Sequence, residues 1–123
     1  MTYNRPLSPH LSIHKKVLTS VFSILHRITG IGLTVGTLLI SIWISLLALG
    51  ADYFYIFKFI STNIIFKFFL FIWTVAIFYH LFNGVRYLFW SFGLGMDLKT
   101  VYFSSYFVLI FTLVATFGVW FIR

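Results

Sequence analysis

The chain has 123 residues, of which 61% are hydrophobic and only 9% are charged, with a formal net charge of +7. This composition excludes a soluble globular domain and indicates a protein that lies in a membrane. The chain has no cysteine, which excludes disulfides, thiolate-bound iron–sulfur clusters and cysteine-based zinc sites.

A basic arm precedes the first long apolar stretch. Residues 1–20 carry Arg5, Lys15 and Lys16, the strongest positive cluster outside the apolar stretches. Positive residues favour the inner side of a membrane, so we expect this arm on the matrix or cytoplasmic side.

The sequence predicts an all-α membrane protein with three transmembrane helices in one domain spanning residues 1–123. The spans are expected at about residues 21–50, 60–91 and 100–122, because each contains an apolar stretch close to the roughly 20 residues that cross a hydrocarbon core. Residues 51–57 are interpreted as a loop. Aromatic residues beside the spans are interpreted as interfacial anchors, an outer set at Tyr53, Phe54, Tyr55 and Phe57 and an inner set at Tyr87, Trp90 and Phe92.

A polar cluster lies near the start of the first span. Ser23 and Arg27 are four residues apart and share a helix face, from which both can donate hydrogen bonds to the carbonyl oxygens of a quinone. His26 points about 100° away. The alternative is that Arg27 reaches lipid phosphate and Ser23 bonds its own backbone. Farther along, Gly32 and Gly36 are typical of close helix contact, or of a flat surface for a planar ligand.

A second cluster lies near the end of the second span. Gly84 follows His80 by four residues and shares its face, so its missing side chain leaves room for the edge of a macrocycle. Arg86 lies nearer the surface, where a cation can meet a carboxylate. Haem b fits these residues, since it takes an axial imidazole and carries propionates. The alternative is a histidine hydrogen-bonded to a neighbouring helix.

Topology places both clusters in one leaflet, because the first span begins and the second ends on the same side. Ionisable groups at membrane depth are costly unless they are paired, and the only carboxylates are Asp52 and Asp97. We therefore expect an anionic ligand from outside the chain. A further possibility is that one iron takes both of its axial ligands from this chain, His26 and His80, although His26 is expected to lie near the membrane surface.

Three motifs together resemble the cytochrome b subunit of succinate dehydrogenase, the large membrane anchor of complex II. They are Arg5-Pro-Leu-Ser-Pro-His10, Ser23-Ile-Leu-His26-Arg27 and His80-x3-Gly84-Val-Arg86. The resemblance covers the whole chain. It implies an anchor, non-catalytic alone, that helps to bind haem b and passes electrons from the iron–sulfur subunit to ubiquinone. A haem-less structural anchor of complex II or of a quinol:fumarate reductase is the alternative.

The resemblance also assigns roles to individual residues. It implies quinone binding by Ser23, Ile24 and Arg27. It implies haem contacts at five residues, with His80 as the axial ligand of the iron: His26, Arg27, His80, Gly84 and Arg86. Three positions depart from the usual family pattern, in which Tyr, His and Asp stand at His14, Tyr87 and Ser91. The last departure leaves open whether Asp97 pairs with Arg86.

Partners and location follow from the same resemblance. It implies an iron–sulfur subunit, a second small membrane anchor that shares the haem, and a flavoprotein subunit joined through the complex. We expect no nucleic acid partner. The expected location is the mitochondrial inner membrane, with a bacterial cytoplasmic membrane as the alternative.

Overall fold

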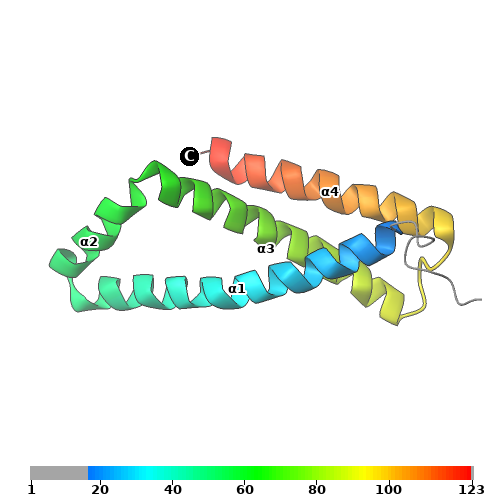
Figure 1. Ribbon diagram of the computed structural model, residues 1–123, viewed down its shortest axis with the longest axis horizontal. Coiled ribbons are helices and arrows are strands. Elements are labelled where there is room, and N and C mark those ends of the chain that lie inside the picture. The colour runs from blue at the N-terminus through cyan, green and yellow to red at the C-terminus, as the bar shows by residue number, and fades with distance from the viewer. Residues whose placement is uncertain (1–16, 123) are drawn as a thin grey trace, which may run out of the picture.

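The computed structural model describes residues 17–122. This part is built from four helices, α1 (Leu18–Leu49), α2 (Ala51–Ser61), α3 (Ile64–Ser91) and α4 (Leu98–Phe121). In Figure 1, α1, α3 and α4 are long rods, and α2 crosses between α1 and α3 at one end. Helices α1, α3 and α4 are long and apolar enough to cross a membrane. The prediction of an all-α protein with three spans is therefore confirmed.

The structure does not test two predictions, which concern the basic N-terminal arm and the side of the membrane on which the N-terminus lies. Residues 1–16, which hold most of the expected basic arm and the motif ending at His10, lie outside the part that the structure describes. Placement of the N-terminus on the inner side of the membrane stays a prediction.

The interpretation of residues 51–57 as a loop is wrong, because they form most of α2. Gly50, at φ 116°, adopts a conformation that favours glycine and separates α1 from α2. The following segment has no glycine or proline to break a helix, and Asp52 in its first turn and Lys58 in its last turn complement the helix dipole.

Helices α3 and α4 each begin at a side-chain cap. Asn63 Oδ1 accepts a hydrogen bond from the Ile65 N–H at 2.8 Å, and Asp97 Oδ2 accepts one from the Thr100 N–H at 3.0 Å. Such caps satisfy a backbone donor that the first helical turn leaves free. The caps account for the start of α3 at Ile64 and of α4 at Leu98.

Helix α3 is the centre of the bundle, since it packs against both α1 and α4. The buried core is small: Phe22, Tyr79 and Val108 meet where the three long helices come together. The buried hydroxyls of Ser105 and Thr112 bond their own helix backbone, which allows close helix contact at these two positions. Most large apolar side chains are exposed, as expected for surfaces that face lipid or other subunits.

Gly32 and Gly36 of α1 differ in their surroundings. A Cβ at Gly36 would overlap the indole of Trp73 on α3, whereas no atom lies within 4 Å of a Cβ at Gly32. Gly36 is therefore a position of close helix contact, and Gly32 is an open one.

Candidate functional site

The two histidines of the expected site lie face to face where α1 begins and α3 ends. The ring centroids of His26 and His80 are 3.9 Å apart, with 9° between their planes. A Cβ at Gly30 would lie 3.1 Å from His80 Cε1, and a Cβ at Gly84 would lie 3.6 Å from His26 Cε1. Each ring thus packs on a glycine of the opposite helix. The structure thus brings His26 and His80 together as predicted, while the placement of both clusters in one leaflet stays a prediction.

Gly84 faces a different neighbour from the one we expected. The space beside it accommodates the His26 ring, where the sequence suggested room for a macrocycle edge. The physical reason is that α1 and α3 cross closely enough at Gly30 and Gly84 for side chains of one helix to reach the backbone of the other. Contact of Gly84 with haem stays a prediction.

Hydrogen bonding fixes the tautomer of His80. Its Nδ1 lies 3.2 Å from the backbone oxygen of His26 and 3.2 Å from Thr29 Oγ1. A carbonyl oxygen can only accept, so the bond to His26 requires the proton to be on Nδ1. The hydroxyl of Thr29 donates to backbone oxygens of its own helix, which leaves a lone pair for His80. Nε2 of His80 then keeps its lone pair, the form in which imidazole binds a metal.

The stacking of the His26 and His80 rings differs from the arrangement that two axial ligands of one iron need, and this alternative stays a prediction. Axial imidazoles approach iron edge-on from opposite sides, whereas rings in face contact at 3.9 Å leave no space for iron between them. Residues 17–122 contain no group of three or more His, Cys, Asp or Glu placed to hold a bare metal ion. The lone pair on Nε2 makes His80 a candidate for one ligand of a metal centre.

One polar atom of the histidine pair has no partner within residues 17–122. Nδ1 of His26 is buried there without a hydrogen bond. A buried polar atom without a partner costs about 1–3 kcal/mol. This orphaned nitrogen, together with the free Nε2 of His80, fits a polar cofactor with a metal centre.

The expected quinone residues gather beside the histidine pair. Ser23, Ile24 and Arg27 of α1 line a surface hollow of about 410 Å³, and Tyr87 and Trp90 of α3 form its other wall. Arg27 is exposed and Ser23 is half-buried, so both can reach a ligand that enters from the outer surface of the bundle. The hollow combines polar donors with apolar walls.

Tyr87 and Trp90 are site residues that sequence reasoning missed. The Tyr87 ring lies edge-on to His26, with centroids 5.1 Å apart, and edge-on to Trp90 at 5.3 Å. Both had been interpreted only as interfacial anchors. Tyr87 follows His80 by seven residues, about two helical turns, which places it on the same face of α3. This spacing is a sequence signal that could have placed Tyr87 beside His80.

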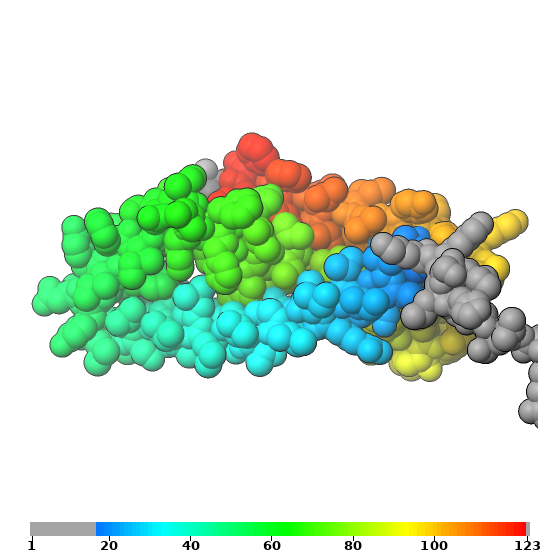
Figure 2. Space-filling view, viewed as in Figure 1, coloured from blue at the N-terminus to red at the C-terminus, as the bar shows by residue number. Residues whose placement is uncertain are grey.

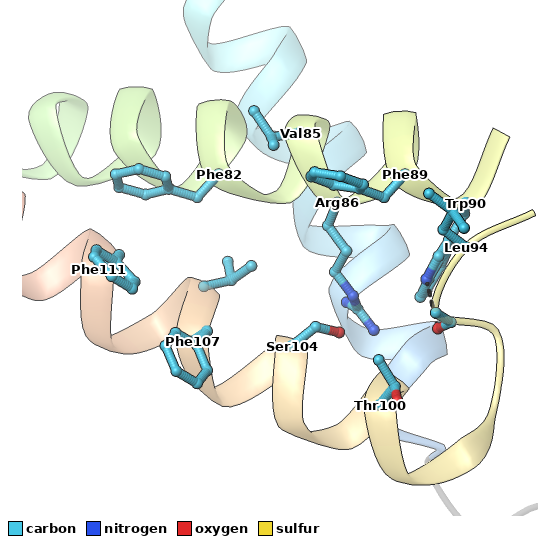
Figure 3. Close-up of a pocket in the computed structure, with 12 residues that line it drawn as sticks. Phe82, Val85, Arg86, Phe89, Trp90, Leu94, Thr100, Ser104, Phe107 and Phe111 are labelled. Atoms are coloured by element: carbon cyan, nitrogen blue, oxygen red, sulfur yellow. Dashed lines mark hydrogen bonds between the residues drawn. The ribbon is translucent and has the colours of Figure 1, made fainter. Parts of the chain in front are cut away.

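Arg86 points away from the histidines and toward α4. Figure 3 shows its side chain reaching from α3 into an apolar pocket of about 480 Å³ between α3 and α4. The side chain is 4% exposed and donates to the Val101 backbone oxygen at 3.1 Å and to Asn83 Oδ1 at 3.4 Å. Its guanidinium lies 4.3 Å from the centre of the Trp90 ring, a favourable cation–π distance. Contact of Arg86 with haem stays a prediction.

Asp97 does not replace the acid that the family pattern usually has at Ser91. Its carboxylate caps α4 by accepting the Thr100 N–H, and this hydrogen bond holds the pKa of Asp97 below its usual value. The hydroxyl of Ser91 donates to the Leu88 backbone oxygen at 2.7 Å. The oxygens that Arg86 meets are thus neutral ones.

Comparison with known proteins gives consistent matches over nearly the whole chain. Residues 1–119 match the family described as the succinate dehydrogenase/fumarate reductase transmembrane subunit. The chain is 39% identical over 119 residues to the succinate dehydrogenase cytochrome b556 subunit of Rickettsia bellii, covering 96% of this chain and 93% of the relative.

Cytochrome b560 subunits of succinate dehydrogenase are also similar. That of Chondrus crispus is 43% identical over 111 residues, which is 87% of each chain. That of Reclinomonas americana is 36% identical over 129 aligned residues, covering 94% of this chain and 86% of the relative.

Proposed function

The chain belongs to the succinate dehydrogenase/fumarate reductase transmembrane-subunit family, and from this premise we propose that it helps to bind haem b and forms part of a quinone-reduction site. It is the cytochrome b membrane-anchor subunit of succinate dehydrogenase and a multi-pass membrane protein. Membership implies haem b and a complex with other succinate dehydrogenase subunits. The residue roles and the individual partners below are proposals.

The observation that carries the haem proposal is the pair of contacts at His80 Nδ1. Both contacts come from α1, at 3.2 Å, and they orient the ring while leaving Nε2 free to bind iron. Haem, when bound, supplies a one-electron carrier. His26, with its orphaned Nδ1, and the exposed Arg27 are then placed to meet the propionates.

Quinone binding is proposed at the adjacent hollow. The Ser23 hydroxyl and the Arg27 guanidinium donate hydrogen bonds to a quinone carbonyl, while Ile24 and Trp90 contact the apolar ring. A guanidinium beside that oxygen also stabilises the negative charge that develops during reduction. Tyr87 adds a phenol hydroxyl to the same hollow.

The remaining ligand groups and partners come from outside this chain. We propose that a second small anchor subunit supplies the other axial ligand and shares the haem. Electrons are proposed to arrive from an iron–sulfur subunit that is in turn reduced by a flavoprotein subunit. The proposed location is the mitochondrial inner membrane, with the N-terminus on the matrix side, and a bacterial cytoplasmic membrane is the alternative.

Two substitutions test the quinone site in the purified complex. Ser23→Ala should lower quinone reduction by succinate about 2- to 10-fold, and Arg27→Leu about 10- to 100-fold, as expected for loss of a neutral and of a charge-assisted hydrogen bond. Succinate oxidation with an artificial dye should stay unchanged. Ser41→Ala is the matched control, because the Ser41 hydroxyl bonds the backbone of its own helix.

The dye activity separates a failed site from a failed complex. Equal loss of dye and quinone activities would indicate that assembly was lost. Wild-type quinone reduction in Arg27→Leu would contradict the proposed site.

A further inference from the structure

A second pocket lies at the end of the bundle far from the histidine pair. It forms where α1 ends, α2 crosses and α3 begins, and its volume is about 720 Å³, larger than the quinone hollow. Figure 1 shows α2 closing this end. In Figure 2 the same end is formed by the last part of α1 (cyan) together with α2 and the start of α3 (green).

The pocket wall combines tryptophans with lysines. Three of the four tryptophans of the chain line it, each from a different long helix: Trp43, Trp73 and Trp120. Lys58 from α2 and Lys67 from α3 bring two positive charges, and none of the residues that line the pocket is acidic. We propose that this pocket binds an anionic phospholipid of the surrounding bilayer.

The two lysines of the pocket suit the phosphate of such a lipid, and the deeper apolar part of the pocket suits its acyl chains. Lys67 lies in the first turn of α3 and Lys58 in the last turn of α2, so both residues lie at the end of the bundle that α2 closes. Leu39 lies ten residues before the end of α1, about 15 Å deeper. The pocket therefore leads from a cationic mouth to an apolar interior. Phosphate favours the first environment and acyl chains the second.

The wall of the pocket is held by contacts within the protein. The indole of Trp73 is seated against Gly36 of α1. Trp120 Nε1 donates to Thr74 Oγ1 at 3.3 Å, and the Phe57 ring of α2 lies edge-on to Phe66 of α3 at 6.0 Å. Because α1, α2, α3 and α4 each anchor part of this wall, the lipid meets a preformed surface, which lowers the entropic cost of binding.

Native mass spectrometry of the purified complex tests the proposal. After mild delipidation, added phosphatidylglycerol should bind to the wild-type complex at least tenfold more tightly than phosphatidylcholine. The double variant Lys58→Gln/Lys67→Gln should lose this preference and retain one anionic lipid fewer. Lys99→Gln, which removes a lysine from the first turn of α4 at the other end of the bundle, is the matched control and should behave as wild type.

A charge-preserving variant and a direct view of the pocket complete the test. Lys58→Arg/Lys67→Arg should keep the preference for phosphatidylglycerol, and quinone reduction should stay at the wild-type level in all these variants. Equal lipid retention in the wild type and the Gln variant would overturn the proposal. A structure of the wild-type complex in bilayers of bromine-labelled phosphatidylglycerol should show bromine in the pocket, and a protein segment filling it would also overturn the proposal.

Discussion

The contact between Gly30 and the imidazole of His80 allows a graded test of the proposed haem site. A Cβ at position 30 would lie 3.1 Å from His80 Cε1, about 0.4 Å closer than an ordinary carbon–carbon contact of about 3.5 Å. Gly30→Ala therefore requires the ring to move by a few tenths of an ångström. Gly30→Val adds two methyl groups and requires a larger movement.

Moving the His80 ring costs free energy because it lengthens the hydrogen bonds of the ring to α1. Nδ1 lies 3.2 Å from both of its acceptors on α1, already at the long end of the normal range. Moving the ring about 0.4 Å away from α1 would lengthen these contacts to about 3.6 Å, at which they are no longer hydrogen bonds. Losing one or both costs about 1–2 kcal/mol, which lowers haem affinity roughly 5- to 30-fold.

Haem content per complex and the reduced-minus-oxidised spectrum measure this effect. We expect a small spectral shift in Gly30→Ala and substoichiometric haem in Gly30→Val. Gly32→Ala is the control, because nothing lies within 4 Å of its Cβ, and it should retain full haem. Full haem with an unshifted spectrum in Gly30→Val would refute the proposed role of this contact.

Three further substitutions test individual contacts. Thr29→Val removes one acceptor from His80 Nδ1 and should raise the haem midpoint potential by an amount on the order of tens of millivolts, because the imidazole becomes a weaker donor; an unchanged potential would count against the hydrogen bond. Tyr87→Phe should raise the KM for quinone severalfold and leave dye-linked succinate oxidation unaltered, so a parallel fall in both would argue against a quinone contact. Arg86→Met removes a buried donor to the Val101 oxygen and should destabilise the complex by about 1–3 kcal/mol, seen as a lower Tm with an unchanged haem spectrum; loss of haem at an unchanged Tm would instead support Arg86 as a haem contact.

The fold was largely predictable because hydropathy and length alone define a membrane span. Helix α2 was missed because a short aromatic segment between two spans resembles an interfacial loop in composition. The signals that favour a helix here are the lack of glycine and proline after Gly50 and the charges of Asp52 and Lys58 in its first and last turns. The position of α2 matters for function, since it forms part of the lysine-containing pocket.

The site was predictable in its location but not in its detailed contacts. Antiparallel spans necessarily bring the start of α1 and the end of α3 to the same side, so the approach of His26 and His80 followed from topology. The stacking of their rings depends on how α1 and α3 rotate about their axes, and packing at the glycines sets that rotation. The direction of Arg86 toward α4 has the same origin, because six residues after His80 it lies about 240° around the helix.

The most direct test of the central claim is the reduced-minus-oxidised spectrum of the purified complex carrying His80→Leu. We expect the b-type bands to be lost or shifted while the complex still assembles and oxidises succinate with an artificial dye. An unchanged b-type spectrum in this variant would contradict His80 as the axial ligand of the haem iron.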